Sequence, residues 1–92
     1  MTSSASSDVY EVLVERRAER DMRRLPEDVA SRVNTAIRKL APTPRPVGCR
    51  KLVGSDSDWR LRVGDYRIVY QIDDEAKQVR VMFIRHRREA YR

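Results

Sequence analysis

The 92-residue sequence predicts an α+β fold in which a helical hairpin packs on one face of a largely antiparallel sheet. Three observations predict it: an alternating strand pattern near the N-terminus, two stretches with apolar residues at helical spacing, and three strand patterns in the C-terminal half. Helices grouped before a run of strands are typical of α+β folds. The expected order is β-α-α-β-β-β.

The first half of the chain carries one strand and two helices. Residues 10–14 alternate like a strand, and Ala18, Met22 and Leu25 then recur at the i, i+4, i+7 spacing of a short helix. Pro26 fits the first turn of a second helix, where its missing N–H costs little. The apolar face of this second helix comprises Val29, Val33, Ile37 and Leu40. Prolines at positions 42, 44 and 46 end it.

The second half carries an irregular connection and three strands. Residues 43–58 are Pro-rich at their start and Ser/Asp-rich at their end, which predicts a loop. Strands are expected at residues 59–63, 66–72 and about 79–85, the last two joined by a polar turn. We expect residues 1–8 to be a disordered N-terminus and residues 9–92 to form a single domain.

The turn at Gly64 and Asp65 fixes the register of the first two of these strands. A two-residue loop with Gly first is typical of a tight hairpin, and it sets Arg62 opposite Arg67. Alternation then divides the hairpin into two faces. The core face comprises Trp59, Leu61, Val63, Tyr66, Ile68 and Tyr70, and the other face comprises Arg60, Arg62, Arg67, Val69 and Gln71. We expect no carboxylate on the second face.

The arginines of the second face indicate a phosphate-binding surface. Like charges that oppose each other on a sheet are destabilising, so they call for a negative partner or for solvation by water. Solvation explains any single arginine, but the grouping of Arg60, Arg62 and Arg67 favours phosphate, whose oxygens match the planar guanidinium group. The net charge of +6 also favours a polyanionic partner.

Composition argues against several other classes of protein. No apolar run approaches the roughly 20 residues that a membrane span needs. The single cysteine, Cys49, allows no internal disulfide and suits a reducing cytoplasm. Neither Cys49 nor His86 has neighbours at metal-ligand spacing. We therefore expect a cytoplasmic protein without a metal or cofactor.

Two motifs together resemble the RelE branch of the RelE/ParE toxin superfamily, the toxic halves of bacterial toxin–antitoxin pairs. They are "WRLRVGDYRIVYQIDD", which follows "KLVG", and the tail "HRREAYR"; with the upstream β-α-α pattern the likeness covers residues 9–92. The resemblance implies a RelE-like fold and a metal-independent endoribonuclease, an mRNA interferase that cleaves mRNA in the ribosomal A site and so inhibits translation. In such toxins the 2′-OH of the mRNA attacks the adjacent phosphate, which gives a 2′,3′-cyclic phosphate.

The resemblance also implies roles for particular residues. Arg67 matches the arginine at the scissile phosphate, Arg87 a second catalytic arginine, and Tyr91 the tyrosine near the reacting ribose. The residues expected to bind RNA phosphate are Arg60, Arg62, His86, Lys51 and Arg50. Arginine keeps its charge at ordinary pH and is a poor general base, so it stays open whether Tyr91, His86 or neither of them carries the proton.

The same likeness leaves two other functions open and implies a partner. A member of the ParE branch would inhibit DNA gyrase without cutting RNA, and a non-catalytic basic module would only bind RNA. The expected partners are the ribosome, mRNA and a cognate antitoxin, a small protein whose helix wraps the toxin. Contact with operator DNA is expected only through the antitoxin, and no membrane partner is expected.

Overall fold

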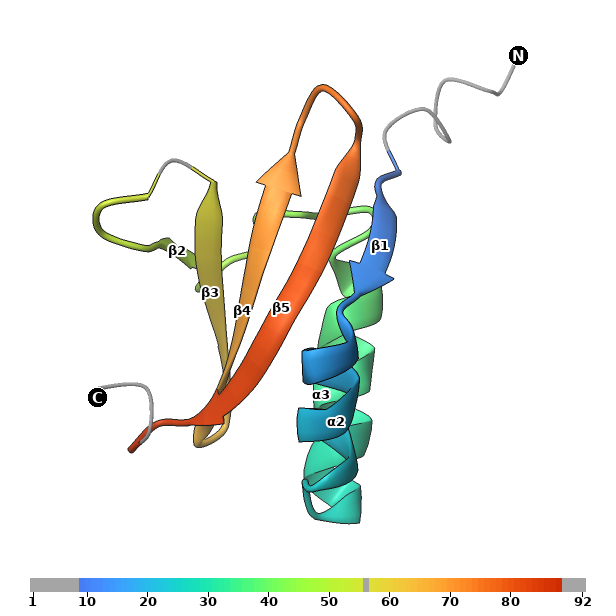
Figure 1. The fold of residues 1–92 in the computed structure, drawn as a ribbon, viewed down its shortest axis with the longest axis vertical. Helices are drawn as coiled ribbons and strands as arrows, with labels where there is room; N and C mark the ends of the chain where they lie inside the picture. Colours follow the sequence, from blue (N-terminus) through green and yellow to red (C-terminus); the bar gives the residue numbers. More distant parts are fainter. Residues whose placement is uncertain (1–8, 56, 89–92) are drawn as a thin grey trace.

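The computed structural model describes residues 9–55 and 57–88 and confirms the predicted α+β class. Its elements are β1 (Glu11–Val14), α2 (Arg16–Arg23), α3 (Glu27–Lys39), β2 (Arg50–Lys51), β3 (Asp58–Val63), β4 (Tyr66–Asp73) and β5 (Gln78–His86) (Figure 1). The expected disordered segment 1–8 and Tyr91 lie outside the described residues. Neither helix in this part of the chain has the length and apolar composition needed to cross a membrane.

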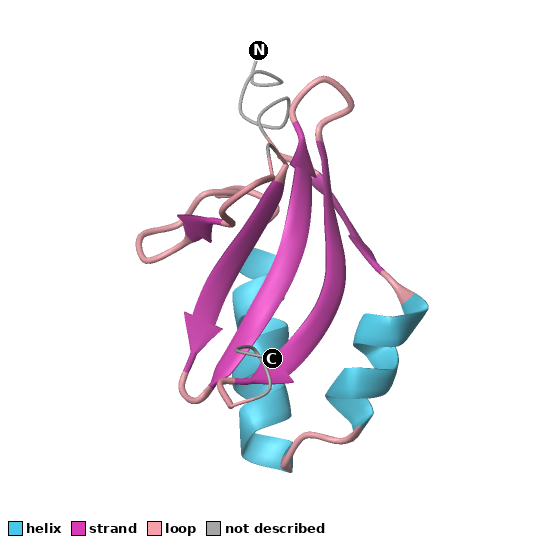
Figure 2. Cartoon of the chain, turned by 60° about the vertical axis from the view of Figure 1, so that its left-hand side comes forward, coloured by secondary structure: helices cyan, strands magenta, loops and turns pink. Residues whose placement is uncertain are grey.

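In the described part of the chain, five strands form one sheet in the order β1-β5-β4-β3-β2. Strand β1 runs parallel to β5, and the other neighbouring strands are antiparallel. Both helices lie against the same face of this sheet (Figure 2). The other face is therefore the one on which the outward side chains of β3, β4 and β5 can meet a partner.

The short strand β2 is absent from the sequence prediction, which has only a loop at residues 43–58. Arg50 and Lys51 pair with Arg60 and Trp59 of β3. Two residues are too few to display an alternating pattern, and the prolines and glycine before them predict a loop. The pairing is set by the neighbouring strand rather than by the local sequence.

The core lies between α3 and the central strands β4 and β5. Its buried side chains are Ala18, Val33, Ile37, Leu40, Ile68, Tyr70, Ile72, Val79, Val81 and Ile84. The expected core face of the hairpin is confirmed, because Ile68 and Tyr70 have no exposed surface and the other four members pack, partly buried, against the core. The opposite face of the hairpin is left to solvent.

A bulge in β5 changes which of its side chains face the helices. Tyr70 pairs with Val81 and Val69 with Phe83, so Met82 is the extra residue. Before the bulge Val81 faces the core, and after it Ile84 does. Simple alternation from Val81 would instead have buried Phe83 and every second residue after it. The bulge therefore reverses which side chains at the end of β5 face the helices and which face outward.

Helix α2 covers the part of the β5 edge that β1 leaves open. Strand β1 ends at Val14, opposite Val81. Beyond this point the Asp21 side chain of α2 provides the hydrogen-bond acceptor at the edge of β5. Its Oδ2 accepts a hydrogen bond from the backbone N–H of Ile84 at 3.0 Å and another from Arg85 Nη1 at 3.1 Å. An exposed row of edge donors would otherwise invite pairing with another chain.

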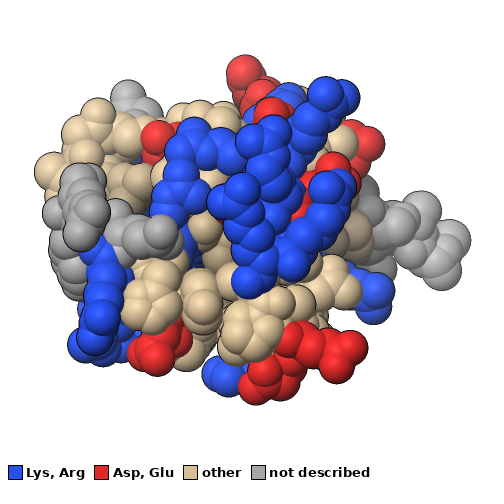
Figure 3. Space-filling model, turned by 60° about the horizontal axis from the view of Figure 1, so that its bottom comes forward, with Lys and Arg blue, Asp and Glu red and all other residues tan. Residues whose placement is uncertain are grey.

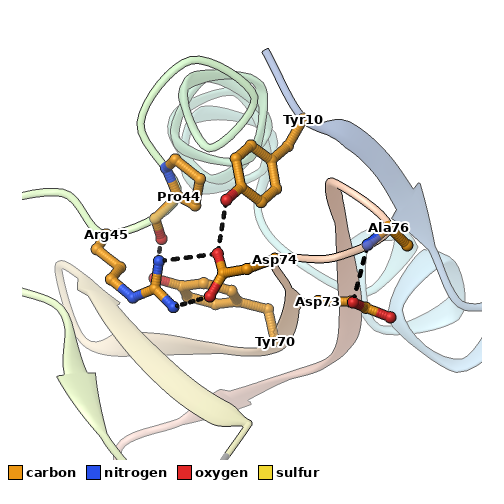
Figure 4. Close-up of polar contacts among 7 residues, drawn as sticks. All are labelled: Tyr10, Pro44, Arg45, Tyr70, Asp73, Asp74 and Ala76. Carbon is orange, nitrogen blue, oxygen red and sulfur yellow. Dashed lines mark hydrogen bonds and ion pairs between the residues drawn. The ribbon is translucent and has the colours of Figure 1, made fainter. Parts of the chain in front are cut away.

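A cluster of contacts around Asp74 holds the loop between α3 and β2 against the sheet (Figure 4). Arg45 of the loop binds the Asp74 carboxylate through both terminal nitrogens, at 3.2 and 2.9 Å, and its Cζ lies 5.0 Å from the centre of the Trp59 ring. The Tyr10 hydroxyl donates to Asp74 Oδ1 at 2.5 Å, and the Tyr70 hydroxyl donates to the Pro44 carbonyl at 2.9 Å. These contacts fix the segment that leads into β2. Arg45 is thus engaged at this end of the sheet rather than free to extend the positive surface.

This cluster predicts an acid-sensitive contribution to stability. The Arg45 guanidinium and then the Tyr10 hydroxyl hold the pKa of Asp74 at about 2, below its ordinary 3.8. Because the pKa is lower in the folded state, the contribution is fully present above pH 3.8 and is lost as the pH falls towards 2. Asp74→Asn should therefore lose less stability than the wild type over this range, as measured by urea unfolding at several pH values. Glu75→Gln, in the same turn, is the control, and equal acid losses in Asp74→Asn and wild type would contradict the assignment.

Candidate nucleic-acid interface

The hairpin of β3 and β4 has the register that its two-residue turn predicts. Arg62 pairs with Arg67, and Val63 pairs with Tyr66 across the turn. Gly64 has φ +59°, a conformation that side-chain-bearing residues rarely adopt. Arg62 Nε donates to the Gly64 carbonyl at 3.2 Å, which directs one of the two arginines along the turn. The prediction that Arg62 and Arg67 share one face is confirmed.

Strand pairing extends this arginine pair into two rows across the outer face of the sheet. In the first row, Arg62 pairs with Arg67 and Arg67 pairs with Arg85. In the second row, Arg50 of β2 pairs with Arg60 of β3. Directly paired residues lie on the same side of a sheet. We call these five residues, Arg50, Arg60, Arg62, Arg67 and Arg85, the arginine face.

Four members of the arginine face enclose a hollow of about 210 Å³, here called the arginine hollow. It is lined by Arg50, Arg60, Arg62, Arg67 and the backbone of Gly48. In the described part of the chain, no ion pair joins Arg50, Arg60 or Arg62 to a carboxylate. Such a concentration of guanidinium groups around one concave site is suited to the oxygens of a phosphodiester.

Two carboxylates of the hairpin strands do lie on this face, contrary to the sequence expectation: Asp58 at the start of β3 and, by alternation from Arg67, Asp73 at the end of β4. Strand β3 begins at Asp58, one residue before the predicted start, and Asp58 pairs with Gln71. Alternation places Asp58 on the same side as Arg60 and Arg62. Asp58 does not line the arginine hollow, whose lining remains entirely basic apart from Gly48.

The structure does not bring all of the predicted site residues together. Lys51 pairs with Trp59 and His86 pairs with Tyr66, so both lie on the helix-covered side of the sheet, away from Arg67. Arg87 directly follows β5, where its backbone N–H donates to the Asp65 carbonyl at 2.7 Å beside the hairpin turn. Tyr91 lies outside the described residues.

Arg85 is the member of the arginine face that the sequence prediction missed. Its place opposite Arg67 depends on the bulge in β5, and the signal for that bulge is the three-residue spacing between the buried Val81 and Ile84. Its Nη1 also contacts Asp21 Oδ2 at 3.1 Å, and the Asp21 side chain is only 15% exposed. The pair therefore holds the Arg85 guanidinium towards α2, at the border of the arginine face.

Chemically, this arrangement can bind a phosphodiester and stabilise added negative charge on it. Guanidinium groups remain protonated at any ordinary pH, so they act as fixed positive charges. Fixed donors aimed at a site where charge develops are an effective way to lower a reaction barrier. No group of three or more His, Cys, Asp or Glu side chains among the described residues is placed to hold a metal ion.

Comparison with known proteins identifies the family of the chain. Residues 12–91 match the family described as ParE toxin of type II toxin-antitoxin system, parDE. Toxin RelE of Mycobacterium tuberculosis is 34% identical over 84 residues, which cover 90% of this chain and 87% of that protein. Toxin RelG of the same organism is 37% identical over 87 residues, covering 90% of this chain and 97% of that protein.

Solved structures show the same fold. A chain of the archaeal RelE–RelB complex from Pyrococcus horikoshii superposes with a TM-score of 0.78 at 24% identity, covering 86% of this chain and 96% of that one. A chain of the toxin–antitoxin complex RelBE2 from Mycobacterium tuberculosis superposes with a TM-score of 0.73 at 29% identity, covering 85% and 98%. The chain therefore belongs to the ParE toxin family of type II toxin–antitoxin systems, within the RelE/ParE superfamily.

Proposed function

We propose that this toxin is a ribosome-dependent endoribonuclease that cleaves mRNA in the A site and thereby inhibits translation in the cytoplasm. The observation that carries the proposal is the arginine hollow, a concave site with four arginines from three adjacent strands. A protein that only needed a soluble surface would gain nothing from opposing Arg62 to Arg67. A phosphodiester bound in the hollow removes that repulsion. The relatives named Toxin RelE and Toxin RelG support an RNA target.

The proposed reaction uses the RNA as its own nucleophile. The 2′-OH attacks the adjacent phosphorus, the bond to the 5′ oxygen of the next nucleotide breaks, and a 2′,3′-cyclic phosphate and a free 5′-OH result. Arg67 and Arg87 stabilise the negative charge of the pentacoordinate phosphorus, while Arg50, Arg60 and Arg62 hold the strand in line for attack. The position of His86 on the helix-covered side, away from Arg67, argues against His86 as the proton carrier.

We propose a cognate antitoxin as the regulatory partner. The similar structures from Pyrococcus horikoshii and Mycobacterium tuberculosis are toxin–antitoxin complexes. An acidic segment of the antitoxin laid over Arg60, Arg62 and Arg67 would compete directly with RNA for the arginine hollow. Contact of this toxin with operator DNA would then pass through the antitoxin.

Inhibition of DNA gyrase is the second candidate function, because the matching family is described by its ParE toxins. The resemblance implies a longer first helix for members of the ParE branch. The first helix here, α2, has only eight residues, which favours RNA cleavage over gyrase inhibition. A gyrase supercoiling assay with the purified toxin separates the two functions. Inhibited supercoiling together with intact ribosome-bound mRNA would overturn the proposed RNA cleavage.

The proposed function is tested by mapping 5′ ends of mRNA after purified toxin is added to ribosomes that hold a defined message. We expect new 5′ ends within the A-site codon, bearing hydroxyl groups, and a 2′,3′-cyclic phosphate on the upstream fragment. The same message without ribosomes should remain largely intact. If the message stays uncut on ribosomes that have bound the toxin, the protein binds RNA without cleaving it, and the proposal is contradicted.

A further inference from the structure

A second basic hollow lies mainly on the helix-covered side of the sheet, between α2 and the ends of β4 and β5, and reaches Arg85 at the border of the arginine face. This α2 hollow has a volume of about 780 Å³. Helix α2 contributes Arg17 and Arg20, and Arg24, which directly follows the helix as its C-cap, lies on the same side of it by the i, i+3, i+7 spacing. The end of β5 contributes Arg85, and Arg88 follows it. The site therefore collects five arginines from two separate segments.

The acidic residue in the lining of the α2 hollow does not neutralise these arginines. Asp21 already accepts hydrogen bonds from the β5 backbone and from Arg85, so its charge is engaged at the base of the site. In the described part of the chain, no ion pair joins Arg20, Arg24 or Arg88 to a carboxylate. Three exposed cations around one concavity are thus available to an anion from another molecule.

Aromatic side chains order this site. The Cζ atoms of Arg17 and Arg85 lie 4.9 and 4.7 Å from the centre of the Phe83 ring, which holds both guanidinium groups by cation–π contact. Tyr66 and His86 meet edge to face with ring centres 5.2 Å apart and form part of the wall. An ordered set of cations beside aromatic rings suits a nucleotide strand, which carries phosphates and flat bases.

A third hollow connects the α2 hollow with the end of the arginine-bearing hairpin. It has a volume of about 520 Å³ and is lined by Asp65, His86, Arg87 and Arg88, two of which also line the α2 hollow. Figure 3, which views the lower end of the molecule in Figure 1, shows Lys and Arg side chains gathered in a broad patch. Through Arg88 and Arg87 the basic surface therefore continues from the α2 hollow to the hairpin end, where Asp65 is the one acidic residue in the lining of the third hollow.

We infer that the α2 hollow is a second RNA-binding site, which holds backbone phosphates outside the cleaved dinucleotide. The inference rests on the proposed function and deepens it, because the RNA at this site is either message next to the A-site codon or ribosomal RNA. RNA explains the continuity with the hairpin end better than an acidic protein segment does, since an evenly spaced polyanion matches an extended basic track. An acidic segment of the antitoxin is the competing occupant.

The test compares two double variants of α2 that lose equal charge. The first variant, Arg20→Gln with Arg24→Gln, removes two of the cations that line the α2 hollow. The second variant, Arg16→Gln with Arg23→Gln, removes two arginines of α2 that do not line the hollow. We expect the first variant to bind RNA roughly tenfold more weakly at physiological salt, with a log–log salt slope smaller by about 1.4. The second variant should bind like the wild type. Equal unfolding curves establish that both variants are folded.

Two arms of the binding experiment identify the source of the RNA. Weaker binding to vacant ribosomes, with unchanged binding to a single-stranded message oligonucleotide, assigns the hollow to ribosomal RNA. Weaker binding to the oligonucleotide assigns it to the message. Equal RNA affinity of the two double variants overturns the inference, as does a loss confined to antitoxin binding. Binding is read without cleavage, so an uncut message with a selective binding loss would refute the proposed reaction and leave this inference standing.

Discussion

Replacing Arg67 by alanine is expected to slow cleavage of ribosome-bound mRNA by about 10²–10³-fold, the usual cost of removing one preorganised donor to a developing charge. Arg67 lies on the central strand β4, opposite Arg62 on one side and Arg85 on the other, and it lines the arginine hollow. Its position is fixed by a fully buried neighbour in the chain, Ile68. Loss of its guanidinium therefore removes the charge at the middle of the site without disturbing the core.

The matched control is Arg80→Ala. Arg80 pairs with Gln71, so it lies on the same face of the sheet, but it binds Glu15 and does not line the arginine hollow. The rate of message cleavage is measured under single-turnover conditions with both variants in excess over ribosomes. Arg80→Ala should cleave at nearly the wild-type rate. Equal rates for the two variants would show that overall charge, and not the arginine hollow, drives the reaction.

Replacing Tyr70 by alanine is expected to lower the free energy of unfolding by about 3–5 kcal/mol, as truncation of a buried aromatic residue usually does. Tyr70 is the largest side chain with no exposed surface, and its ring packs in the core cluster between the sheet and α3. Burial raises the pKa of its hydroxyl, which donates a hydrogen bond to the Pro44 carbonyl. A loss of this size is a large part of the roughly 5–15 kcal/mol that holds a small domain folded.

Tyr70→Phe separates the packing of the ring from the hydrogen bond of the hydroxyl. It keeps the ring and removes only the donor to Pro44, so we expect a loss of about 1 kcal/mol. Urea unfolding at neutral pH measures both variants. A loss below about 1 kcal/mol for Tyr70→Ala would contradict the central place of this side chain in the core.

The hairpin could be predicted from the sequence because its information is local. A two-residue turn with glycine first leaves one register, and alternation then assigns every side chain of β3 and β4 to a face. The strongly periodic helices were accessible for the same reason, since Val33, Ile37 and Leu40 recur at helical spacing and all three are buried.

The rest of the candidate site depends on contacts between distant segments. Arg50 joins the arginine face only because β2 pairs with β3, and a two-residue strand leaves no pattern in the sequence. The bulge at Met82 decides that Arg85 faces outward and that His86 faces the helices. The α2 hollow could not be predicted from the sequence either. The arginines of α2 have the pattern of an ordinary solvated helix face, and only the packing of β5 beside them forms the hollow.

The measurement that tests the central claim most directly is the RNA affinity of the double variant Arg62→Gln, Arg67→Gln, with its free energy of unfolding as the check on folding. If the two arginines are opposed in order to bind phosphate, the variant binds RNA at least about tenfold more weakly. Its stability is equal or higher, because the lost repulsion offsets the lost contacts of the two arginines, among them the bond from Arg62 to Gly64. A folded variant with unchanged RNA affinity would contradict the account.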